Sequence, residues 1–374
     1  MNGEADIGVV GAGIVGLCTA LALRERGASV QVYESGSPGR GQSFGETRIF
    51  RHAHADPRLV ALARESRAMW NEWADRFGVE LVSGDGAIAI GPAVERRLAL
   101  LEDAGVRARA IGPSELCERL APLALYEGPA MLDAAGGALR VRAAIGALTA
   151  QLDGGLVRDE VISLRPTGRG TVEVRGVGVR AEHARVVVCA GRGTAQLARG
   201  VGLALPVRLG AHARVTFDVR DHSDRLACLQ DGSGDFGAVA YGSALPGNER
   251  YAVGVSESVG ARDDGSLVDP SSLAALADRA SAYVQRALPG LDAQPVDYVH
   301  CWVTELPWSD DAVAVWEADE IFFAAGHNLF KHAPALGRAL ARTALGEPLA
   351  APLRPEATLG LPREDRADAR AGRS

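Results

Sequence analysis

Lysine is almost absent from this chain of 374 residues. Of its 40 basic residues, 39 are arginine and only Lys331 is lysine. A bias of this kind replaces lysine by arginine wherever any cation is sufficient. Lys331 therefore either occupies a position that needs a compact ammonium group or has been retained by chance. Composition alone leaves both interpretations open.

Long apolar runs, paired cysteines and a basic surface are also missing. No run approaches the roughly 20 apolar residues that cross a bilayer, and residues 1–7 lack the basic start of a secretory signal. The five scattered cysteines have no metal-ligand spacing, which is typical of a reducing cytoplasm. The net charge of −7 disfavours nucleic acid and membrane surfaces as partners. The sequence therefore predicts a cytoplasmic protein without membrane, nucleic-acid or metal partners.

The length predicts two domains, and the chain opens with a β-α-β pattern. An apolar strand at 7–10 precedes a Leu- and Ala-rich helix that ends at Arg26, and a second strand follows at 29–33. Between the first strand and the helix, Gly11, Gly13 and Gly16 form G-x-G-x-x-G. These glycines allow a tight turn, close approach to a pyrophosphate and close helix–strand packing. Glu34, at the end of the second strand, can accept hydrogen bonds from ribose hydroxyls. Together, the glycine motif and Glu34 predict a dinucleotide-binding site.

The remaining pattern places a mostly antiparallel part inside the nucleotide-binding part. Helices are expected at 57–77, 94–104, 113–120, 141–152, 270–288 and 335–345. Strands are expected at 157–164, 171–174, 177–181, 186–189, 214–219, 237–241, 251–255, 298–304, 312–315 and 321–325. A buried strand, Gly326 and a helix close the chain, which is more than a simple NAD dehydrogenase needs.

Residues 43–53, S-F-G-E-T-R-I-F-R-H-A, indicate a family. They closely resemble the S-x-G-[DE]-T-R-x-x-R-x-A loop of the monomeric sarcosine oxidase and N-methyltryptophan oxidase family, within the D-amino-acid-oxidase superfamily. The resemblance extends over the chain except its C-terminal tail. It implies that this loop crosses the face of FAD, with Ser43 and Thr47 among the cofactor contacts and Arg48 against the flavin. It also implies that Arg51 holds the substrate carboxylate, since a planar guanidinium binds a carboxylate through two hydrogen bonds.

Four later segments carry the same resemblance. Residues 187–191 and 321–326 resemble the middle and C-terminal strands of FAD proteins of the glutathione-reductase type, which implies cofactor contacts at Gly191 and Gly326, and at Val161 before them. Residues 326–331, G-H-N-L-F-K, resemble the family segment G-x-x-G-x-G-F-K but are about two residues shorter. Lys331 then matches the second carboxylate ligand and a cofactor contact. Tyr241-Gly242 resembles a pair that lines the family's substrate pocket.

Cys301 matches the family cysteine that bonds covalently to FAD. A thiolate must attack an electrophilic flavin carbon there, and a nearby cation such as Arg48 would assist by stabilising negative charge on the ring. The alternative is a buried structural cysteine, which is the common state of a free thiol in a folded protein.

The substrate side departs from the family pattern. The family lysine beside the flavin, which assists reaction with dioxygen, falls on Ala252. Arg250 lies two residues earlier on the same strand face and is a weak candidate to supply that charge. Two pocket positions read Ser256 and Val303. A substrate other than sarcosine and slow use of dioxygen are therefore expected.

The sequence thus predicts an α/β, two-domain FAD-dependent oxidoreductase. A doubly wound FAD-binding domain of the glutathione-reductase type is expected from residues 1–81, 140–207 and 302–360. An antiparallel-sheet substrate domain is expected from 82–139 and 208–301, with the site between the two and a disordered tail at 361–374. The expected reaction oxidises the C–N bond of a secondary, cyclic or N-methyl amino acid to an imine, with O2 as the acceptor and H2O2 as the product.

Two other functions stay open at this point. One is a biosynthetic amine or imine dehydrogenase with poor O2 reactivity, acting on an unusual amino acid. The other is a non-catalytic flavin-binding subunit. The expected partner is a small amine or amino acid, with a carrier protein as a further candidate, and the expected state is a monomer.

Overall fold

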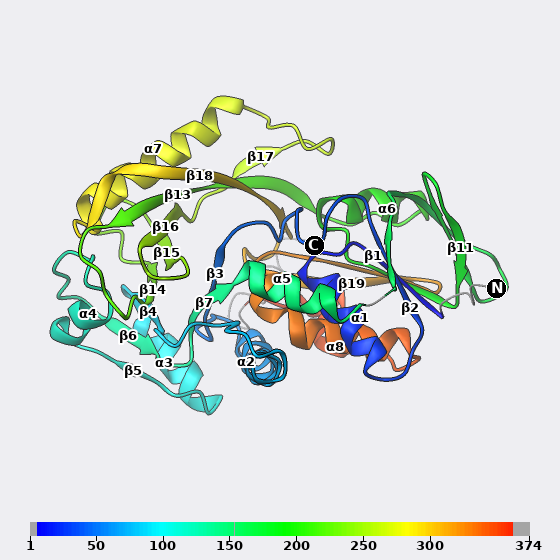
Figure 1. Ribbon diagram of the computed structural model, residues 1–374, viewed down its shortest axis with the longest axis horizontal. Coiled ribbons are helices and arrows are strands. Elements are labelled where there is room, and N and C mark those ends of the chain that lie inside the picture. The colour runs from blue at the N-terminus through cyan, green and yellow to red at the C-terminus, as the bar shows by residue number, and fades with distance from the viewer. Residues whose placement is uncertain (1–5, 153, 362–374) are drawn as a thin grey trace, which may run out of the picture. The chain divides into compact units, whose positions relative to one another are not determined.

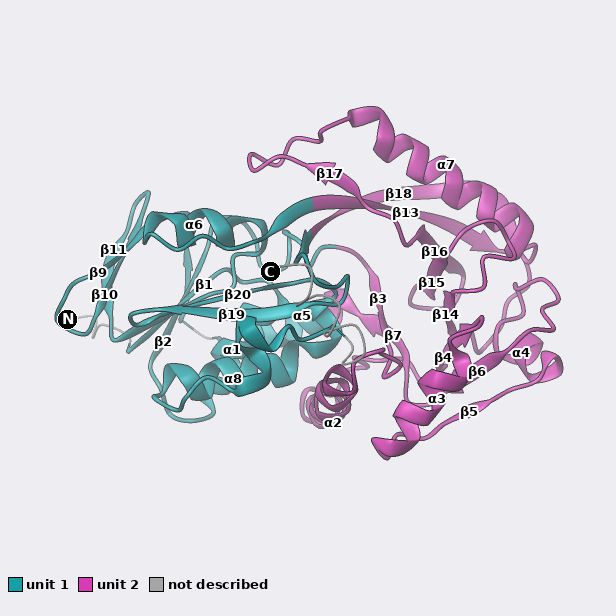
Figure 2. Cartoon of the chain, turned by 180° about the vertical axis from the view of Figure 1, so that it is seen from behind, with its two compact units in different colours: residues 1–44, 144–209, 304–374 teal, residues 45–143, 210–303 magenta. Residues whose placement is uncertain are grey.

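The computed structural model describes residues 6–152 and 154–361. The chain divides into two compact units (Figure 2), of which unit 1 comprises Met1–Phe44, Ala144–Leu209 and Thr304–Ser374, and unit 2 comprises Gly45–Ala143 and Gly210–Val303. The first segment of unit 1 ends at Phe44, whereas the first segment of the predicted FAD-binding domain ran on to residue 81. The difference arises because residues 47–50 and 57–77 belong to unit 2. The tail expected at 361–374 lies, from residue 362 on, outside the described residues.

Unit 1 contains a six-stranded sheet, a smaller sheet and several helices. Its strands are β1 (Ile7–Val10), β2 (Val30–Glu34), β8 (Leu156–Arg158), β9 (Val161–Pro166), β10 (Val172–Gly176), β11 (Arg180–His183), β12 (Arg185–Val188), β19 (Val313–Ala318) and β20 (Ile321–Gly326). Its helices are α1 (Ile14–Arg24), α5 (Val141–Ala150, which begins in unit 2), α6 (Thr194–Gly200) and α8 (Ala333–Ala344), with short 3-10 turns at Gly191–Gly193, Leu329–His332, Ala351–Leu353 and Pro355–Ala357.

Three distant chain segments build the main sheet of unit 1. Its strand order is β19-β20-β12-β1-β2-β8, in which β1 pairs in parallel with both β2 and β12, and β12 pairs in parallel with β20. Helices α1 and α8 pack together on one face of this sheet, whereas α6 and the antiparallel strands β9–β11 lie on the other (Figure 1). This is the doubly wound arrangement that the sequence predicts, because helical or sheet layers cover both faces of a mostly parallel sheet.

Unit 2 contains one large sheet, a two-stranded sheet and four helices. Its strands are β3 (Thr47–Phe50), β4 (Ala87–Ile90), β5 (Ala108–Ala110), β6 (Ala130–Asp133), β7 (Gly137–Arg140), β13 (Arg208–Val219), β14 (Cys228–Asp231), β15 (Ala240–Ala244), β16 (Arg250–Val255), β17 (Val259–Ala261) and β18 (Leu291–Glu305). Its helices are α2 (Pro57–Phe77), α3 (Val94–Asp103), α4 (Pro113–Arg119) and α7 (Pro270–Ala287).

The large sheet of unit 2 has one apolar and one polar face. Its order is β17-β13-β16-β15-β14-β4-β6-β5, with β18 paired to β13. On β13, Ala213, Val215 and Phe217 belong to a core that also includes residues of α7. His212 and Arg214 alternate with them and therefore lie on the opposite face, although both are buried.

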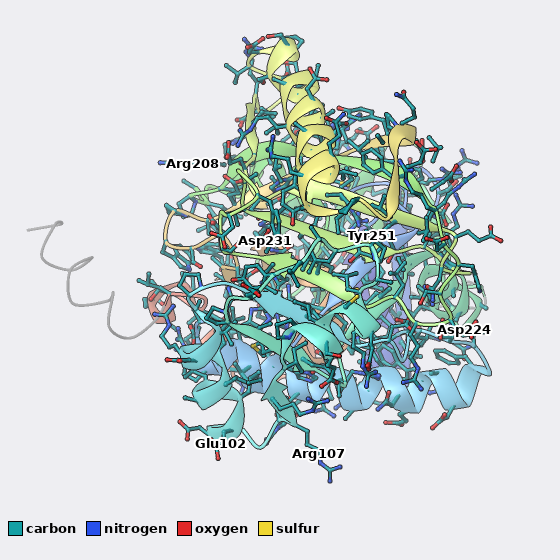
Figure 3. All side chains as sticks on the ribbon, turned by 90° about the vertical axis from the view of Figure 1, so that its left-hand side faces the viewer. Glu102, Arg107, Arg208, Asp224, Asp231 and Tyr251 are labelled. Atoms are coloured by element: carbon teal, nitrogen blue, oxygen red, sulfur yellow. The ribbon has the colours of Figure 1, made fainter. Side chains whose placement is uncertain are left out.

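Two side chains show where the core of unit 2 lies. Tyr251 and Asp231 are buried inside this unit, whereas Glu102 and Arg107 project from its edge (Figure 3). The Asp231 carboxylate accepts hydrogen bonds from the Ser233 amide at 2.8 Å and hydroxyl at 2.6 Å, so the chain turns directly after β14. Asp231, the last residue of β14, is therefore still buried in unit 2.

Two predicted strands and one predicted loop differ in the structure. The strand expected at 237–241 runs instead from 240 to 244, where pairing with β16 sets its register. The expected loop at 43–53 contains β3, which pairs with β7. The strand expected at 298–304 is part of the longer β18. Among the described residues, no helix is both long and apolar enough to cross a bilayer.

Candidate functional site

The glycine motif of unit 1 joins β1 to α1 by a very close turn. Gly11 has φ +99°, a conformation that side chains disfavour, and a Cβ on Gly16 would lie 1.9 Å from the Gly11 carbonyl oxygen. Gly13 precedes the helix without any side-chain cap, and the first turn of α1 carries no acidic residue. No residue of the first helical turn therefore neutralises the positive end of α1, which suits the phosphates of a nucleotide.

Glu34 and Ser43 hold this turn in place. One carboxylate oxygen of Glu34 accepts the Ala12 amide at 2.9 Å and the other accepts the Gly36 amide at 2.9 Å. The Ser43 hydroxyl accepts the amide of Ile14 at 2.9 Å, which satisfies one of the free amides at the start of α1. Glu34 is only half buried, so its carboxylate keeps lone pairs for a ribose. These residues fit the adenosine diphosphate portion of FAD.

Three further predicted cofactor contacts lie elsewhere in unit 1. Gly191 follows β12 with φ +55°, and Gly326 ends β20, the strand that pairs in parallel with β12. These two glycines therefore follow neighbouring strands of one sheet, at the edge where parallel α/β sheets bind ligands. Val161 begins β9 in the three-stranded sheet and packs against the core shared by both sheets.

Lys331 is buried, with 4% of its side chain exposed. Its Nζ donates to the Asn328 carbonyl oxygen at 3.2 Å and lies 3.9 Å from a carboxylate oxygen of Asp311. Asn328 adopts a left-handed conformation with φ 55° and donates from its side chain to the same carboxylate at 2.8 Å. The only lysine of the chain is thus a buried cation held in a polar loop after β20.

Arg48 and Cys301 come together in unit 2, although 253 positions separate them in the sequence. Nη2 of Arg48 lies 3.6 Å from Sγ of Cys301, and Nη1 donates to the Thr47 carbonyl oxygen at 2.9 Å. Burial lowers the pKa of Arg48, and the nearby Cys301 opposes that shift. A guanidinium remains charged under any such shift, so the thiol has a permanent cation beside it.

Two contacts of Arg51 lie within its own segment. Its Nη1 donates to the Ala53 carbonyl oxygen and lies 3.2 Å from Nδ1 of His54. The resemblance predicts that Arg51 is a carboxylate ligand, and a guanidinium has five N–H groups, so these contacts are compatible with a further ligand.

Tyr241 lies beside an arginine that the sequence analysis did not identify. The guanidinium carbon of Arg214 is 5.8 Å from the centre of the Tyr241 ring, and the His212 ring meets the same tyrosine edge-on. Arg214 donates from Nη1 to the Thr47 carbonyl oxygen at 2.6 Å and from Nη2 to the Ser243 hydroxyl at 2.9 Å. Burial raises the pKa of Tyr241, so the phenol stays protonated. An arginine inside the alternating pattern of residues 211–217 was the available signal.

The residues that depart from the family pattern lie in different surroundings. Arg250 is exposed and pairs with Asp218 at 3.0 Å, so this candidate for a charge near the flavin is a surface ion pair. Ala252 and Val303 are buried, and Ser256 is exposed.

A chain with a doubly wound dinucleotide unit, a glycine turn suited to phosphates and a second antiparallel unit has the architecture of a flavin-dependent oxidoreductase. The comparison with family models agrees with this class. The chain belongs to the DAO family of FAD-dependent oxidoreductases, whose model matches residues 6–343.

Solved structures share the fold over nearly the whole chain. NikD, an unusual amino acid oxidase essential for nikkomycin biosynthesis, is 22% identical over 92% of this chain and 95% of its own in an open form, with a TM-score of 0.79. L-proline dehydrogenase from P. horikoshii is 20% identical over 97% and 98%, with a TM-score of 0.82. Glycine oxidase from Geobacillus kaustophilus is 21% identical over 94% and 98%, with a TM-score of 0.73. No curated protein sequence matches this chain significantly.

Proposed function

We propose that this enzyme oxidises the C–N bond of a secondary, cyclic or N-methyl amino acid to an imine. Bound FAD supplies the acceptor for the hydride that leaves the carbon next to nitrogen. The observation that carries the proposal is the Arg48–Cys301 contact at 3.6 Å, because the family resemblance independently assigns both residues to the flavin. The same contact and residues 43–53 support a place near the monomeric sarcosine oxidase and N-methyltryptophan oxidase group.

The chain's own residues bind and orient the substrate in this proposal. Arg51 and Lys331 hold the carboxylate, which fixes the reacting carbon. Tyr241 contacts the amine side as a neutral phenol. The amine must lose its proton before hydride transfer, and nearby cations such as Arg48 favour the neutral amine.

We also propose that Cys301 forms a thioether with the flavin. Arg48 would hold a fixed positive charge beside the sulfur. The new C–S bond would replace one S–H bond of Cys301 and one C–H bond of the flavin, and dioxygen would take up the two electrons and two protons as H2O2. Cys301 is only half buried on β18.

A biosynthetic dehydrogenase with poor O2 reactivity is the second candidate. Ala252 stands where the sarcosine oxidase group has its oxygen-reactive lysine, and Lys331 is held in a loop of unit 1. One structural neighbour, NikD, is described as essential for nikkomycin biosynthesis, and another is named a proline dehydrogenase. A non-catalytic flavin-binding subunit has less support. Such a subunit has no need for Arg51 and Lys331, the two residues that match the family's carboxylate ligands.

The substrate and setting follow from the same residues. A substrate tethered to a carrier protein through its carboxyl group would leave nothing for Arg51 and Lys331 to hold, so we propose a free amino acid. We place the reaction in the cytoplasm and assign it to the monomer, on the cysteine pattern and on the family resemblance.

The direct test is anaerobic mixing of the purified flavoprotein with single amino acids. Sarcosine, L- and D-proline, pipecolate, glycine and the dicarboxylic pyrrolidine-2,5-dicarboxylate are added separately, and bleaching of the flavin absorption is followed. Bleaching by a secondary or cyclic amino acid supports the proposal, whereas spectral shifts without bleaching by any of them point to the non-catalytic subunit. Readmission of air then separates the candidates, because an oxidase regains its colour in each turnover and a dehydrogenase regains it slowly.

Acid precipitation tests the thioether separately. The flavin colour is expected to remain in the pellet, since a covalent bond survives unfolding. A colourless pellet below a yellow supernatant contradicts covalent attachment while leaving the oxidoreductase proposal intact.

A further inference from the structure

Arg214 is a buried cation on the polar face of the unit 2 sheet. Only 7% of this residue is exposed. Pairing of β13 with β16 and of β16 with β15 places Arg214, Gly254 and Tyr241 in one row across the three strands. A Cβ on Gly254 would lie 2.6 Å from the Tyr241 hydroxyl, so the absence of a side chain there leaves room for the phenol ring.

The guanidinium of Arg214 is incompletely paired. Two of its nitrogens donate to the Thr47 carbonyl and the Ser243 hydroxyl, whereas the buried Nε has no hydrogen-bond partner among the described residues. Within that same part of the chain, no carboxylate forms an ion pair with Arg214. A buried charge without a counter-charge is costly, so this side chain is suited to an anion that arrives from outside.

A second cation increases the demand for negative charge. Arg48 donates to the same Thr47 carbonyl oxygen as Arg214, so the two guanidinium groups are neighbours. Their repulsion contributes to the lowered pKa of Arg48. In the proposed function Arg48 contacts the flavin, and one substrate carboxylate is held by Arg51 and Lys331. Arg214 then remains without an anion.

A further donor lies in the same row of the sheet as Arg214. The Tyr241 hydroxyl makes no hydrogen bond to any residue that the structure describes, and burial keeps it protonated. The Arg214 guanidinium lies over the same ring. A guanidinium N–H and a phenol O–H are both hydrogen-bond donors, and together they can bind one carboxylate.

We propose that Arg214 and Tyr241 bind a second carboxylate of the substrate, so that the enzyme selects an amino acid with an acidic side chain. This rests on the proposed function, which assigns the first carboxylate to Arg51 and Lys331. The inference thereby narrows the substrate class from cyclic or N-methylated amino acids in general to their dicarboxylic members.

The test compares two rigid probes that have no carbon able to lose hydride. Pyrrole-2-carboxylate carries one carboxylate and pyrrole-2,5-dicarboxylate carries two. Their dissociation constants are measured by calorimetry on the flavin-loaded enzyme and on the Arg214→Met, Arg214→Lys and Arg51→Met variants. Arg250→Met is the matched control, because it removes one arginine from the same sheet at an exposed ion pair. Flavin content and melting temperature verify that each variant is folded.

The wild type is expected to bind the dicarboxylate about 10- to 100-fold more tightly than the monocarboxylate, as one charge-assisted pair provides. Arg214→Met should abolish this preference, Arg214→Lys should restore part of it, and Arg250→Met should keep it. Arg51→Met should weaken both probes alike.

Three results would overturn the inference. The wild type could bind both probes equally, Arg214→Met could keep the preference, or Arg214→Met could weaken both probes to the same extent. The last result would make Arg214 a ligand of the first carboxylate. The calorimetric binding measurement needs no turnover. Failure of every amino acid to bleach the flavin would therefore refute the proposed function, and the preference for the dicarboxylate probe could still be interpreted.

Discussion

Replacing Gly16 by alanine should displace the start of α1 and thereby weaken FAD binding. The added Cβ would lie 1.9 Å from the Gly11 carbonyl oxygen, and side-chain carbons essentially never approach other atoms within 3.0 Å. The helix or the turn must therefore move by about 1 Å, a shift of the size that overpacking produces. The neighbouring Gly11 cannot readily yield, because it already has φ +99°.

The surroundings of α1 make this movement costly. Every residue from Ile14 to Leu23 is buried. On the α8 side, a Cβ on Gly337 would lie 2.7 Å from the backbone of Cys18, so the two helices are already in close contact. Overpacking of this kind costs about 1–3 kcal/mol in the free energy of unfolding. The same movement misaligns the helix amides that suit the FAD phosphates, so flavin loss should exceed what the stability change alone predicts.

The assay is the flavin-to-protein absorption ratio after purification, together with thermal unfolding. Gly146→Ala is the matched control, because Gly146 lies exposed in α5 with no atom within 4 Å of the added carbon. That control should keep its flavin and gain up to about 1 kcal/mol. Full flavin content and an unchanged melting temperature in Gly16→Ala would refute the reasoning from the close turn.

Three other predictions concern Cys301, Tyr283 and His212. Cys301→Ser should still bind FAD but release it on acid precipitation; a pellet that stays yellow would exclude this residue as the attachment point. Tyr283→Phe removes a 2.8 Å hydrogen bond to the buried Asp231 and should lower the free energy of unfolding in urea by about 1–3 kcal/mol. Tyr298→Phe, at an exposed site, should leave that free energy almost unchanged, and equal effects of the two substitutions would contradict the argument. Burial lowers the pKa of His212 below its usual value, so the folded protein holds it neutral while the unfolded chain binds a proton. Stability should therefore fall as the pH drops below about 6.5, by up to ~1.4 kcal/mol per pH unit from this group, and His212→Gln should flatten that slope; an unchanged slope in unfolding measured from pH 7 to pH 5 would show that the histidine is not the cause.

The nucleotide-binding part of the fold could be predicted because its signals are local. The strand, glycine turn, helix and acid from residue 7 to Glu34 follow one another directly, and each has a distinct physical requirement. The late strand β20 was also predictable, as a buried apolar run before Gly326. Its pairing with β12 was not predicted, because no local pattern specifies which strands become neighbours.

Residues whose role depends on distant partners were harder to predict. Arg214 is buried because β3, β15 and β16 surround it, and within its own segment only the alternating pattern of residues 211–217 gave a sign of that. Arg250 was a candidate for a functional charge on strand alternation alone, yet Asp218 on the neighbouring strand pairs with it at the surface. The Arg48–Cys301 contact joins residues 253 positions apart, so only the resemblance could suggest it.

The three-segment sheet also constrains how the protein is made. Synthesis proceeds from the N-terminus, so β1 and α1 leave the ribosome long before β12 and β20 exist. Until residue 344 has emerged, α1 lacks the helix that covers it, and its apolar surface stays available to chaperones or to other nascent chains. The second unit ends at Val303 and can complete its own core earlier. Unit 1, which begins the chain, is therefore the last to be finished, and a ribosome that stalls before β20 releases a protein whose nucleotide-binding half cannot close.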